Sequence, residues 1–397
     1  MIDPSLALRL ILSISLDSIF ENIPLEKALN RVLAEDIVAD RPFPPFDRVT
    51  MDGIAINFHE FESGKREFEI LGVQTAGDAR IKLYNNSGCV EVMTGAILPE
   101  GFDTVIRYED LEIGDGIAKV VSDKIKSGQN IHYRGIDATL GQVLVEKNTQ
   151  INAGIMAVAA TVGKSELLVT SNPRIIILAT GDELVQVNQT PKDYQIRASN
   201  TWAIRSILKN AGFNSEIRLM KDEPKILEKE ISEMLQKFEV LILSGGVSMG
   251  KKDYLPEILT SLGVKNHFHK IAQKPGKPMW FGCTEKNIIF ALPGNPVSSF
   301  LCTAHYVLPW LQNHIGLKLE IFQKVMLDSE ENNPFDITFF KQAKLKNESG
   351  NLLAKSLPNN GSGDFVNLSK SDGFIVLPPK KEGRYLKGEI VEFLKIS

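Results

Sequence analysis

The sequence is poor in the features that mark disulfide-rich, metal-cluster and membrane proteins. Its 397 residues include only three cysteines, Cys89, Cys283 and Cys302, without C-x-x-C spacing. This scatter excludes a disulfide framework and a cysteine-rich metal site, and it suits a reducing cytoplasm. No apolar run is long enough to cross a bilayer. The apolar stretch 6–16 carries Arg9 and lacks a basic start and an A-x-A cleavage pattern, so we expect no signal peptide and a cytoplasmic location.

Excess positive charge and a dinucleotide fingerprint are missing as well. The formal net charge is -4, which argues against a general nucleic-acid binder because no basic excess is available to neutralise phosphates. No G-x-G-x-x-G follows any strand that we predict. Because the chain has no basic excess, any anion site must be formed by a local group of residues. A chain of this length is also too long for one core, so we expect two to four domains.

The stretch 240–278 has the pattern of such a local anion site. Its apolar run 240–243 predicts a buried parallel strand. Small residues follow the strand, and their backbone N–H groups can approach an anion closely. They are Ser244, Gly245, Gly246, Ser248 and Gly250. After a predicted helix at 256–262 come Lys270, Lys274 and Lys277, on a loop that two prolines stiffen.

A nucleotide P-loop is the competing interpretation of the glycine loop. Residues 245–251 fit G-x-x-x-x-G-K after a strand, but Lys252 stands where a P-loop needs Ser or Thr to hold magnesium. A pterin- or nucleotide-binding protein that uses Gly245–Lys251 remains an alternative. The nucleotide-driven form of this alternative predicts ATP turnover without any pterin.

Strands and helices alternate around this stretch. The run 174–180 predicts a buried strand that ends at Gly181, Asp182 and Glu183. Helices at 200–211 and 224–236, strands at 216–220 and 287–291, and a helix from Pro296 complete the pattern. Such alternation indicates a parallel sheet, which places ligands at the carboxyl ends of its strands.

The remaining segments predict two helices and two β-rich regions. Asp3 and Pro4 cap an opening helix, and a second helix is expected from Pro24, with an apolar stripe at helical spacing. That stripe consists of Leu25, Ala28, Leu29, Val32 and Leu33. A proline-rich boundary at 41–47 starts a β-rich region that extends to about 137. Residues 322–397 form a second β-rich region, which we expect to be a small barrel.

Several motifs in order resemble the molybdopterin molybdenumtransferases, the family of bacterial MoeA and the E-domain of animal gephyrin. The resemblance is carried by S-G-G-V-S-x-G-x-x-D-Y at 244–254, K-x-x-x-K-P-G-K-P at 270–278 and L-P-G-N-P-V-S at 292–298. It implies an α/β multidomain protein. The expected domains are a helical linker and dimerisation domain (1–41 and 139–170), an inserted β-rich domain (42–138), a parallel-sheet α/β molybdopterin-binding domain (171–318) and a C-terminal small β-barrel (319–397).

The resemblance also assigns roles to single residues. Met51-Asp52-Gly53, Met93-Thr94-Gly95-Ala96 and Gly128–Asp137 match family motifs, although Ile54 replaces a family tyrosine and removes its hydroxyl. The implied catalytic residues are Asp52, Thr94, Asp137, Glu183, Asp222, Asp253, Lys270 and Lys274. The implied pterin-binding residues are Thr180, Gly181, Asp182, Ser244, Gly245, Gly246, Ser248, Gly250, Lys277, Pro293, Gly294, Asn295 and Pro296. Magnesium would be held by Asp182, Glu183 and Asp222.

The implied reaction converts adenylylated molybdopterin and molybdate into molybdenum cofactor and AMP, with magnesium assisting cleavage of the phosphoanhydride. Dithiolene sulfurs of the pterin would hold the molybdenum, so no protein thiolate is needed. The family pattern further implies a homodimer with shared active sites, and other proteins of molybdenum cofactor biosynthesis as partners. A scaffold protein without turnover remains an alternative, because gephyrin also organises receptors. The sequence pattern fits molybdate and tungstate equally as the oxyanion substrate.

Overall fold

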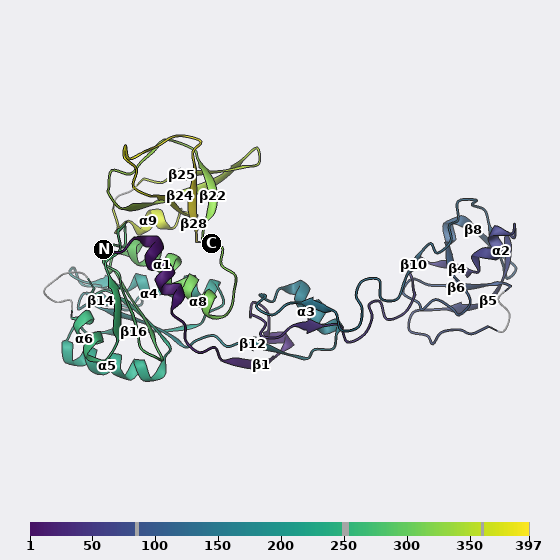
Figure 1. Ribbon diagram of the computed structural model, residues 1–397, viewed down its shortest axis with the longest axis horizontal. Helices are drawn as coiled ribbons and strands as arrows, with labels where there is room; N and C mark the ends of the chain where they lie inside the picture. The colour runs from purple at the N-terminus through teal and green to yellow at the C-terminus, as the bar shows by residue number, and fades with distance from the viewer. Residues whose placement is uncertain (84–86, 248–253, 359–360, 397) are drawn as a thin grey trace.

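The computed structural model describes residues 1–83, 87–247, 254–358 and 361–396. Figure 1 shows an elongated chain with a large body at one end, a narrow linker in the middle and a smaller β-structure at the other end. Both termini lie in the large body. We call its two parts the α/β region (171–318) and the C-terminal barrel (319–397), and the other two parts the linker region (14–41 and 139–170) and the inserted β-region (42–138). Among the described residues, no helix is long and apolar enough to cross a membrane.

A six-stranded sheet in the order β16-β13-β17-β21-β20-β18 forms the centre of the α/β region. The first four strands are parallel, and β20 and β18 add an antiparallel edge. The strands are β13 (Ile175–Thr180), β16 (Ser215–Met220), β17 (Val240–Ser244), β18 (Lys265–His269), β20 (Trp280–Cys283) and β21 (Ile288–Leu292). Every residue of β13, β17 and β21 is buried, which explains why these strands are apolar except for Thr180 and Ser244 at their ends. The predicted parallel sheet is confirmed.

Helices cover this sheet at the predicted places. They are α4 (Ser199–Asn210), α5 (Pro224–Lys237), α6 (Leu255–Ser261), α7 (Pro296–Cys302), a π-helical turn (Thr303–Val307) and α8 (Leu308–His314). Two short strands, β14 (Leu184–Val185) and β15 (Ile196–Arg197), pair in parallel just before α4. Helices α4 and α5 each bury one apolar stripe, as amphipathic surface helices do.

The opening helix α1 (Pro4–Ser13) begins at the predicted cap, where the Asp3 carboxylate accepts hydrogen bonds from the first turn. We expected it in the linker region. It instead packs against α8, with Ala7 and Ile11 fully buried in the core of the α/β region. The indole Nε1 of Trp310 donates to the Ile14 carbonyl at 2.7 Å and fixes the end of the helix.

The C-terminal region is a closed barrel, as predicted. Its five strands pair in the circular order β22-β25-β24-β26-β28, because β28 also pairs with β22. They are β22 (Gln323–Leu327), β24 (Thr338–Glu348), β25 (Asn351–Ser356), β26 (Gly373–Leu377) and β28 (Ile390–Lys395), with β23 (Glu331–Asn332), β27 (Arg384–Tyr385) and α9 (Phe365–Leu368) beside them. Residues 270–278, which carry Lys270, Lys274 and Lys277, form what we call the lysine loop. Its strand β19 (Gln273–Lys274) pairs with β24, so the lysine loop is attached to the barrel.

The linker region contains less helix than we predicted. Its elements are β1 (Phe20–Pro24), a 3-10 turn (Leu25–Lys27), β2 (Ile37–Val38), β11 (Val143–Val145), α3 (Ala153–Thr161) and β12 (Glu166–Thr170). The prediction of a second helix from Pro24 is wrong. Asn30 has a left-handed φ of 66°, and Val32 and Leu33 form bridges to Gln150 and Val169. Burial against α3 and β12 therefore overrides the helical spacing of this stripe.

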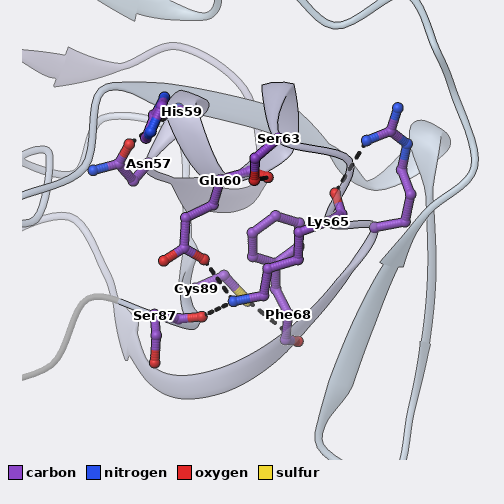
Figure 2. A network of polar contacts seen from close by, with 9 residues as sticks. Asn57, His59, Glu60, Ser63, Lys65, Phe68, Ser87 and Cys89 are labelled. Atoms are coloured by element: carbon purple, nitrogen blue, oxygen red, sulfur yellow. Dashed lines mark hydrogen bonds and ion pairs between the residues drawn. The ribbon is translucent and has the colours of Figure 1, made fainter.

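The inserted β-region holds a six-stranded sheet in the order β7-β4-β6-β5-β9-β8. Its elements are β3 (Arg48–Val49), β4 (Gly53–Ile56), α2 (Phe58–Glu62), β5 (Glu67–Gln74), β6 (Cys89–Val92), β7 (Thr104–Arg107), a 3-10 turn (Tyr108–Asp110), β8 (Leu111–Gly114), β9 (Ile117–Val120) and β10 (Ile131–His132). Figure 2 shows how Lys65 ties α2 to the sheet, because its ammonium donates to the Glu60 carboxylate and the Ser87 carbonyl beside Cys89.

Candidate active site

The carboxyl ends of β13, β17 and β21 surround a cavity of about 330 Å³, which we call the first cavity. The predicted residues that line it are Thr180, Glu183, Ser244, Gly245, Gly294, Asn295 and Pro296. Gly181, Asp182, Gly246 and Pro293 lie next to these residues in the chain but do not line it. The expected ligand-binding edge of the sheet is thus hollow, and residues from three separate loops face it.

Glycine is required at the bottom of the first cavity. Gly245 has a left-handed φ of 99°, and a Cβ there would lie 2.8 Å from the Thr180 carbonyl oxygen. The same Cβ position on Gly294 would lie 3.7 Å from the Gly245 Cα, so the two backbones pass close to each other. The loops can therefore approach a ligand with their backbone atoms.

Sequence reasoning missed the segment before and at the start of α4, of which Arg197, Ser199, Asn200 and Thr201 are polar residues that line the first cavity. The Asn200 amide Nδ2 donates to the Gly294 carbonyl at 2.7 Å and to Ser244 Oγ at 3.2 Å. It thereby ties the start of α4 to the ends of β17 and β21. A signal was available for Asn200, because it is a polar residue at the start of a helix that we predicted, whereas Arg197 lies before that helix in β15.

A second cavity of about 600 Å³ lies between the lysine loop and the barrel. Lys274 and Lys277 line it from the α/β region, and Lys341 and Ser362 line it from the barrel. Asn295 lines both cavities, and its Nδ2 donates to Ser362 Oγ at 2.8 Å. The two cavities are therefore adjacent, although no sequence pattern had linked Lys341 or Ser362 to the α/β residues.

Two lysines that line the second cavity, Lys274 and Lys341, are in different electrostatic settings. Lys274 Nζ lies 3.8 Å from the centre of the Phe335 ring, as in a cation–π contact. Lys341 Nζ lies 2.5 Å from the Glu331 carboxylate, whose side chain is only 3 % exposed. The charge of Lys341 is thus compensated within the barrel, whereas Lys274 has an aromatic contact and no carboxylate partner among the described residues.

A buried network of hydrogen bonds joins the lysine loop to the helical segment that contains Cys302 and Tyr306. Gln273 Nε2 donates to the Pro275 carbonyl at 3.1 Å, and the Tyr306 hydroxyl donates to Gln273 Oε1. Gly276 has a φ of 93°, and a Cβ there would lie 2.6 Å from Gln273 Nε2 and 2.8 Å from Cys302 Sγ. Burial raises the pKa values of Cys302 and Tyr306, so both stay neutral and act as packing and hydrogen-bonding groups.

Lys270 is the predicted lysine that lines neither cavity. Its backbone has a left-handed φ of 80°, its N–H donates to the Met279 carbonyl at 2.9 Å, and its carbonyl accepts from Ile2 N–H at 3.1 Å. The structure thus places its backbone beside the N-terminus of the chain. A catalytic role for Lys270 stays a prediction.

The predicted magnesium ligands lie at the rim of the first cavity. Asp182 Oδ1 accepts from the Asp222 backbone N–H at 3.4 Å, and Glu183 lines the cavity itself. Within 1–83, 87–247, 254–358 and 361–396, no group of three acidic, His or Cys side chains forms a metal cage. Magnesium usually binds through one or two carboxylates and completes its shell with water and substrate phosphates, so the residues fit that mode. Ser248, Gly250 and Asp253 lie outside the described residues.

In the inserted β-region, Asp52 and Thr94 form a pair on the surface. The Thr94 backbone N–H and hydroxyl donate to Asp52 Oδ1 at 2.6 and 2.8 Å. The backbone hydrogen bond from Thr94, then the hydroxyl, hold the pKa of Asp52 below its ordinary value. The carboxylate is therefore ionised and fixed in direction at neutral pH.

Asp137 belongs to a second hydrogen-bonded group in the same region, which sequence reasoning did not identify. His132 Nε2 lies 2.9 Å from Asp137 Oδ1, and His132 Nδ1 lies 3.4 Å from the Arg48 guanidinium. Because a guanidinium only donates, Nδ1 accepts, so Nε2–H donates to Asp137. His132 stands in the quoted motif 128–137, and its pairing with β3 could have indicated this contact.

The two sets of predicted residues do not meet within one chain. Asp52, Thr94 and Asp137 belong to the inserted β-region, and the residues of both cavities belong to the large body. Figure 1 shows these two parts at opposite ends of the elongated chain, with the linker between them.

Comparison with known proteins assigns three matching family models to the chain. They are described as MoeA N-terminal region (domain I and II) at residues 4–163, probable molybdopterin binding domain at 176–313 and MoeA C-terminal region (domain IV) at 336–396. A molybdopterin molybdenumtransferase of Synechocystis is 38 % identical over 93 % of both chains. One of Staphylococcus aureus is 33 % identical over 94 % of this chain and 90 % of the other.

A solved structure has the same architecture. The molybdopterin biosynthesis MoeA protein from Pyrococcus horikosii superposes with a TM-score of 0.85 at 26 % identity, covering 100 % of this chain and 99 % of the other. The expected multidomain α/β fold is therefore confirmed.

Proposed function

The chain belongs to the MoeA family of molybdopterin molybdenumtransferases, enzymes of molybdenum cofactor biosynthesis, and from this premise we propose that it transfers molybdenum from molybdate to adenylylated molybdopterin and releases AMP. The observation that carries the proposal is the pair of adjacent cavities that share Asn295. One is bordered by backbone donors at the sheet edge, and the other by lysines. The reaction needs two such neighbouring sites, because both substrates are anions that must meet.

Molybdate is assigned to the second cavity. Lys274 and Lys277 line it, and a tetrahedral dianion is stabilised by positively charged donors. Lys341 contributes less net charge because Glu331 neutralises it. The contact of Lys274 with Phe335 and the network under Gly276 hold the lysine loop in place before the anion arrives.

The pterin substrate is assigned to the first cavity and its rim. Thr180, Ser244, Gly245 and Asn295 offer hydroxyl, amide and backbone groups there. Asp182, Glu183 and Asp222 would hold a magnesium ion, which when bound supplies positive charge to the phosphoanhydride. These carboxylates would also orient water at the bond that is cleaved.

The inserted β-region of a second copy would complete each site. Asp52, with its direction fixed by Thr94, and Asp137, held by His132, would then face the cavities of the partner. A two-fold dimer has two such shared clefts. The distance between the two sets in one chain supports this arrangement. A cytoplasmic location and other proteins of molybdenum cofactor biosynthesis as partners belong to the same proposal.

The test is a single assay. Purified protein is mixed with adenylylated molybdopterin, magnesium and molybdate, and AMP release is followed by chromatography. We expect AMP release that depends on molybdate. ATP turnover without pterin would support the nucleotide-driven alternative, and AMP release that ignores molybdate would refute the proposed transfer.

A further inference from the structure

Cys283 is the cysteine of this chain that solvent can reach. Cys89 and Cys302 are fully buried, whereas Cys283 is partly exposed at the end of β20. It lines a cavity of about 630 Å³ together with the β20–β21 turn, the start of β18 and the segment after α6. Cys283 pairs with Ile288, the first residue of β21, whereas the first cavity lies at the carboxyl end of that strand. The thiol is therefore at the opposite end of the sheet from the first cavity.

A histidine stands directly beside this thiol. His267 Nε2 lies 3.1 Å from Cys283 Sγ, within hydrogen-bonding distance. The register of β18 and β20 shifts at this point, so His267 is an extra residue without a partner in β20, as in a β-bulge. Gly282 permits the close approach of the two strands, because a Cβ there would lie 2.6 Å from the Lys265 carbonyl oxygen. The backbone thus brings the histidine and the thiol together.

The two groups are a thiol and a neutral imidazole at pH 7. Burial, followed by the charge of Lys265, lowers the pKa of His267, so one ring nitrogen has a free lone pair. Burial raises the pKa of Cys283, although Lys265 opposes this shift, so the group keeps its proton. A thiol must lose its proton before it attacks, and the thiolate of a high-pKa thiol is a strong nucleophile. His267 therefore stands where a base would have to be.

The cavity in front of the thiol favours an anionic small molecule. Two lysines, Lys265 and Lys286, line it with one carboxylate, that of Glu285. The rim is ordered, because the Lys286 and Asn287 backbone N–H groups donate to Thr284 Oγ1 at 3.1 and 3.0 Å. A volume of about 630 Å³ is within the range of pockets that hold small molecules.

We propose that Cys283 is a thiol–disulfide exchange site for a low-molecular-weight disulfide that carries carboxylates, with His267 as the proton acceptor. Nε2 of a ring protonated on Nδ1 takes the thiol proton while the Cys283 sulfur attacks one sulfur of the disulfide. The S–S bond of the reagent breaks, and one half stays on Cys283 as a mixed disulfide. The other half leaves as a thiolate, which takes up the proton from His267. Cys283 is oxidised and the departing sulfur is reduced, so no other oxidant is needed.

The main experiment measures the rate of mixed-disulfide formation between the full-length protein and oxidised glutathione. Mass spectrometry of tryptic peptides follows Cys283, with Cys89 and Cys302 as buried internal controls. At pH 7 we expect the rate at Cys283 to be at least about tenfold lower in His267→Gln, which removes the base. His59→Gln, at an exposed histidine of the inserted β-region, should match the wild type.

The pH profile separates a base from a merely structural histidine. In His267→Gln the rate should follow the thiolate fraction and rise about tenfold per pH unit between pH 6.5 and pH 8. In the wild type it should rise less steeply, because neutral His267 accepts the proton over this whole range. His267→Phe, which can keep the ring contact with Phe281, should behave as His267→Gln does, and melting temperatures near that of the wild type show that both variants fold.

A second reagent tests the charge of the ligand. Lys286→Met should lower the rate with oxidised glutathione about threefold, but not the rate with cystamine, a disulfide that carries amino groups. An equal loss with both reagents would overturn the assignment of an anionic ligand.

Two outcomes would overturn the exchange site itself. One is an equal rate and pH slope in the wild type and His267→Gln. The other is modification of Cys89 or Cys302 as fast as that of Cys283, because the reaction would then follow unfolding. The assay contains neither pterin nor molybdate, so its result does not depend on the proposed molybdenum transfer.

Discussion

The inserted β-region and the α/β region hold their site residues in opposite ways. In the inserted β-region, Asp52 and Asp137 are exposed, and Thr94 and His132 already donate to them. In the α/β region, the start of α4 and the buried Thr180 hydroxyl border a cavity with donors that have no described partner. One region therefore presents fixed carboxylates, and the other presents free donors around a hollow.

This difference indicates that the two regions complement each other. Carboxylates fixed at a surface can orient water or polar groups of a substrate, but they repel its phosphates. Free donors and lysines attract those phosphates and molybdate. Under the proposed function, separating the two groups of residues between distant regions of one chain would mean that chemistry begins only when two copies bring them together.

The largest expected effect comes from mixing two inactive variants. Asp52→Ala and Asp222→Ala subunits are co-expressed, and AMP release is compared with each variant alone. With random pairing about half of the dimers are mixed, and each mixed dimer has one cleft without a lesion, so activity should return to roughly a quarter of wild type. Activity that stays at the level of the single variants would show that each cleft is built within one subunit.

The next prediction compares lysines of the two regions. Lys274→Ala should lower AMP release at limiting molybdate about tenfold, because it deletes a charged donor of the second cavity, whereas Lys277→Arg keeps its charge and should lose less. Lys82→Ala is the control, since Lys82 is an exposed lysine of the inserted β-region that pairs with Glu100. Equal activity of the two cavity variants would contradict the molybdate assignment.

The third prediction uses pH, to which the large body should respond more strongly. His305 is 2 % exposed among Tyr306, Phe322 and Phe340, and burial lowers its pKa to about 3. Its unfolded value is near 6.5, so as pH falls the unfolded chain takes up the proton first. The stability that neutral His305 contributes is therefore full above about pH 6.5 and declines towards pH 3, by up to about 1.4 kcal/mol per pH unit.

Urea titrations at several pH values test this dependence. His305→Phe removes the titrating group, so its unfolding midpoint should fall less between pH 6.5 and pH 4 than that of the wild type. His59→Gln, at an exposed histidine of the inserted β-region, should follow the wild type. Parallel curves for all three proteins would show that His305 does not set the acid sensitivity.

The sequence predicted the parts of this site that depend on local pattern. Strands β13, β17 and β21 are buried and are apolar except for Thr180 and Ser244 at the ends of the first two, which made the sheet edge and its glycine loops predictable. The second helix failed because Val32 and Leu33 pair with residues more than a hundred positions away. Helical spacing alone cannot report such a contact.

The missed site residues have the same cause. Arg197 and Asn200 face the first cavity because the short pairing of β14 with β15 aims the start of α4 at the sheet edge. Lys341 and Ser362 reach the second cavity only after the barrel closes and β19 joins β24. Contacts between distant segments set these positions, whereas the motifs that we recognised are continuous in sequence.

The smallest expected effect concerns Asp52, whose carboxylate is exposed. Thr94→Val removes the hydroxyl that donates at 2.8 Å but keeps the backbone N–H that donates at 2.6 Å. The pKa of Asp52 should therefore rise only part of the way to its ordinary value, since the backbone hydrogen bond is the larger cause of its depression. Because a depressed carboxyl pKa adds stability that is lost only as pH falls through the folded value, the variant should match the wild type in stability at neutral pH. Carboxyl NMR titration measures the shift, with Asn57→Ala in the same region as a control that leaves Asp52 unchanged. A return of the pKa to the ordinary value would instead assign the fixed direction of this carboxylate to the hydroxyl alone.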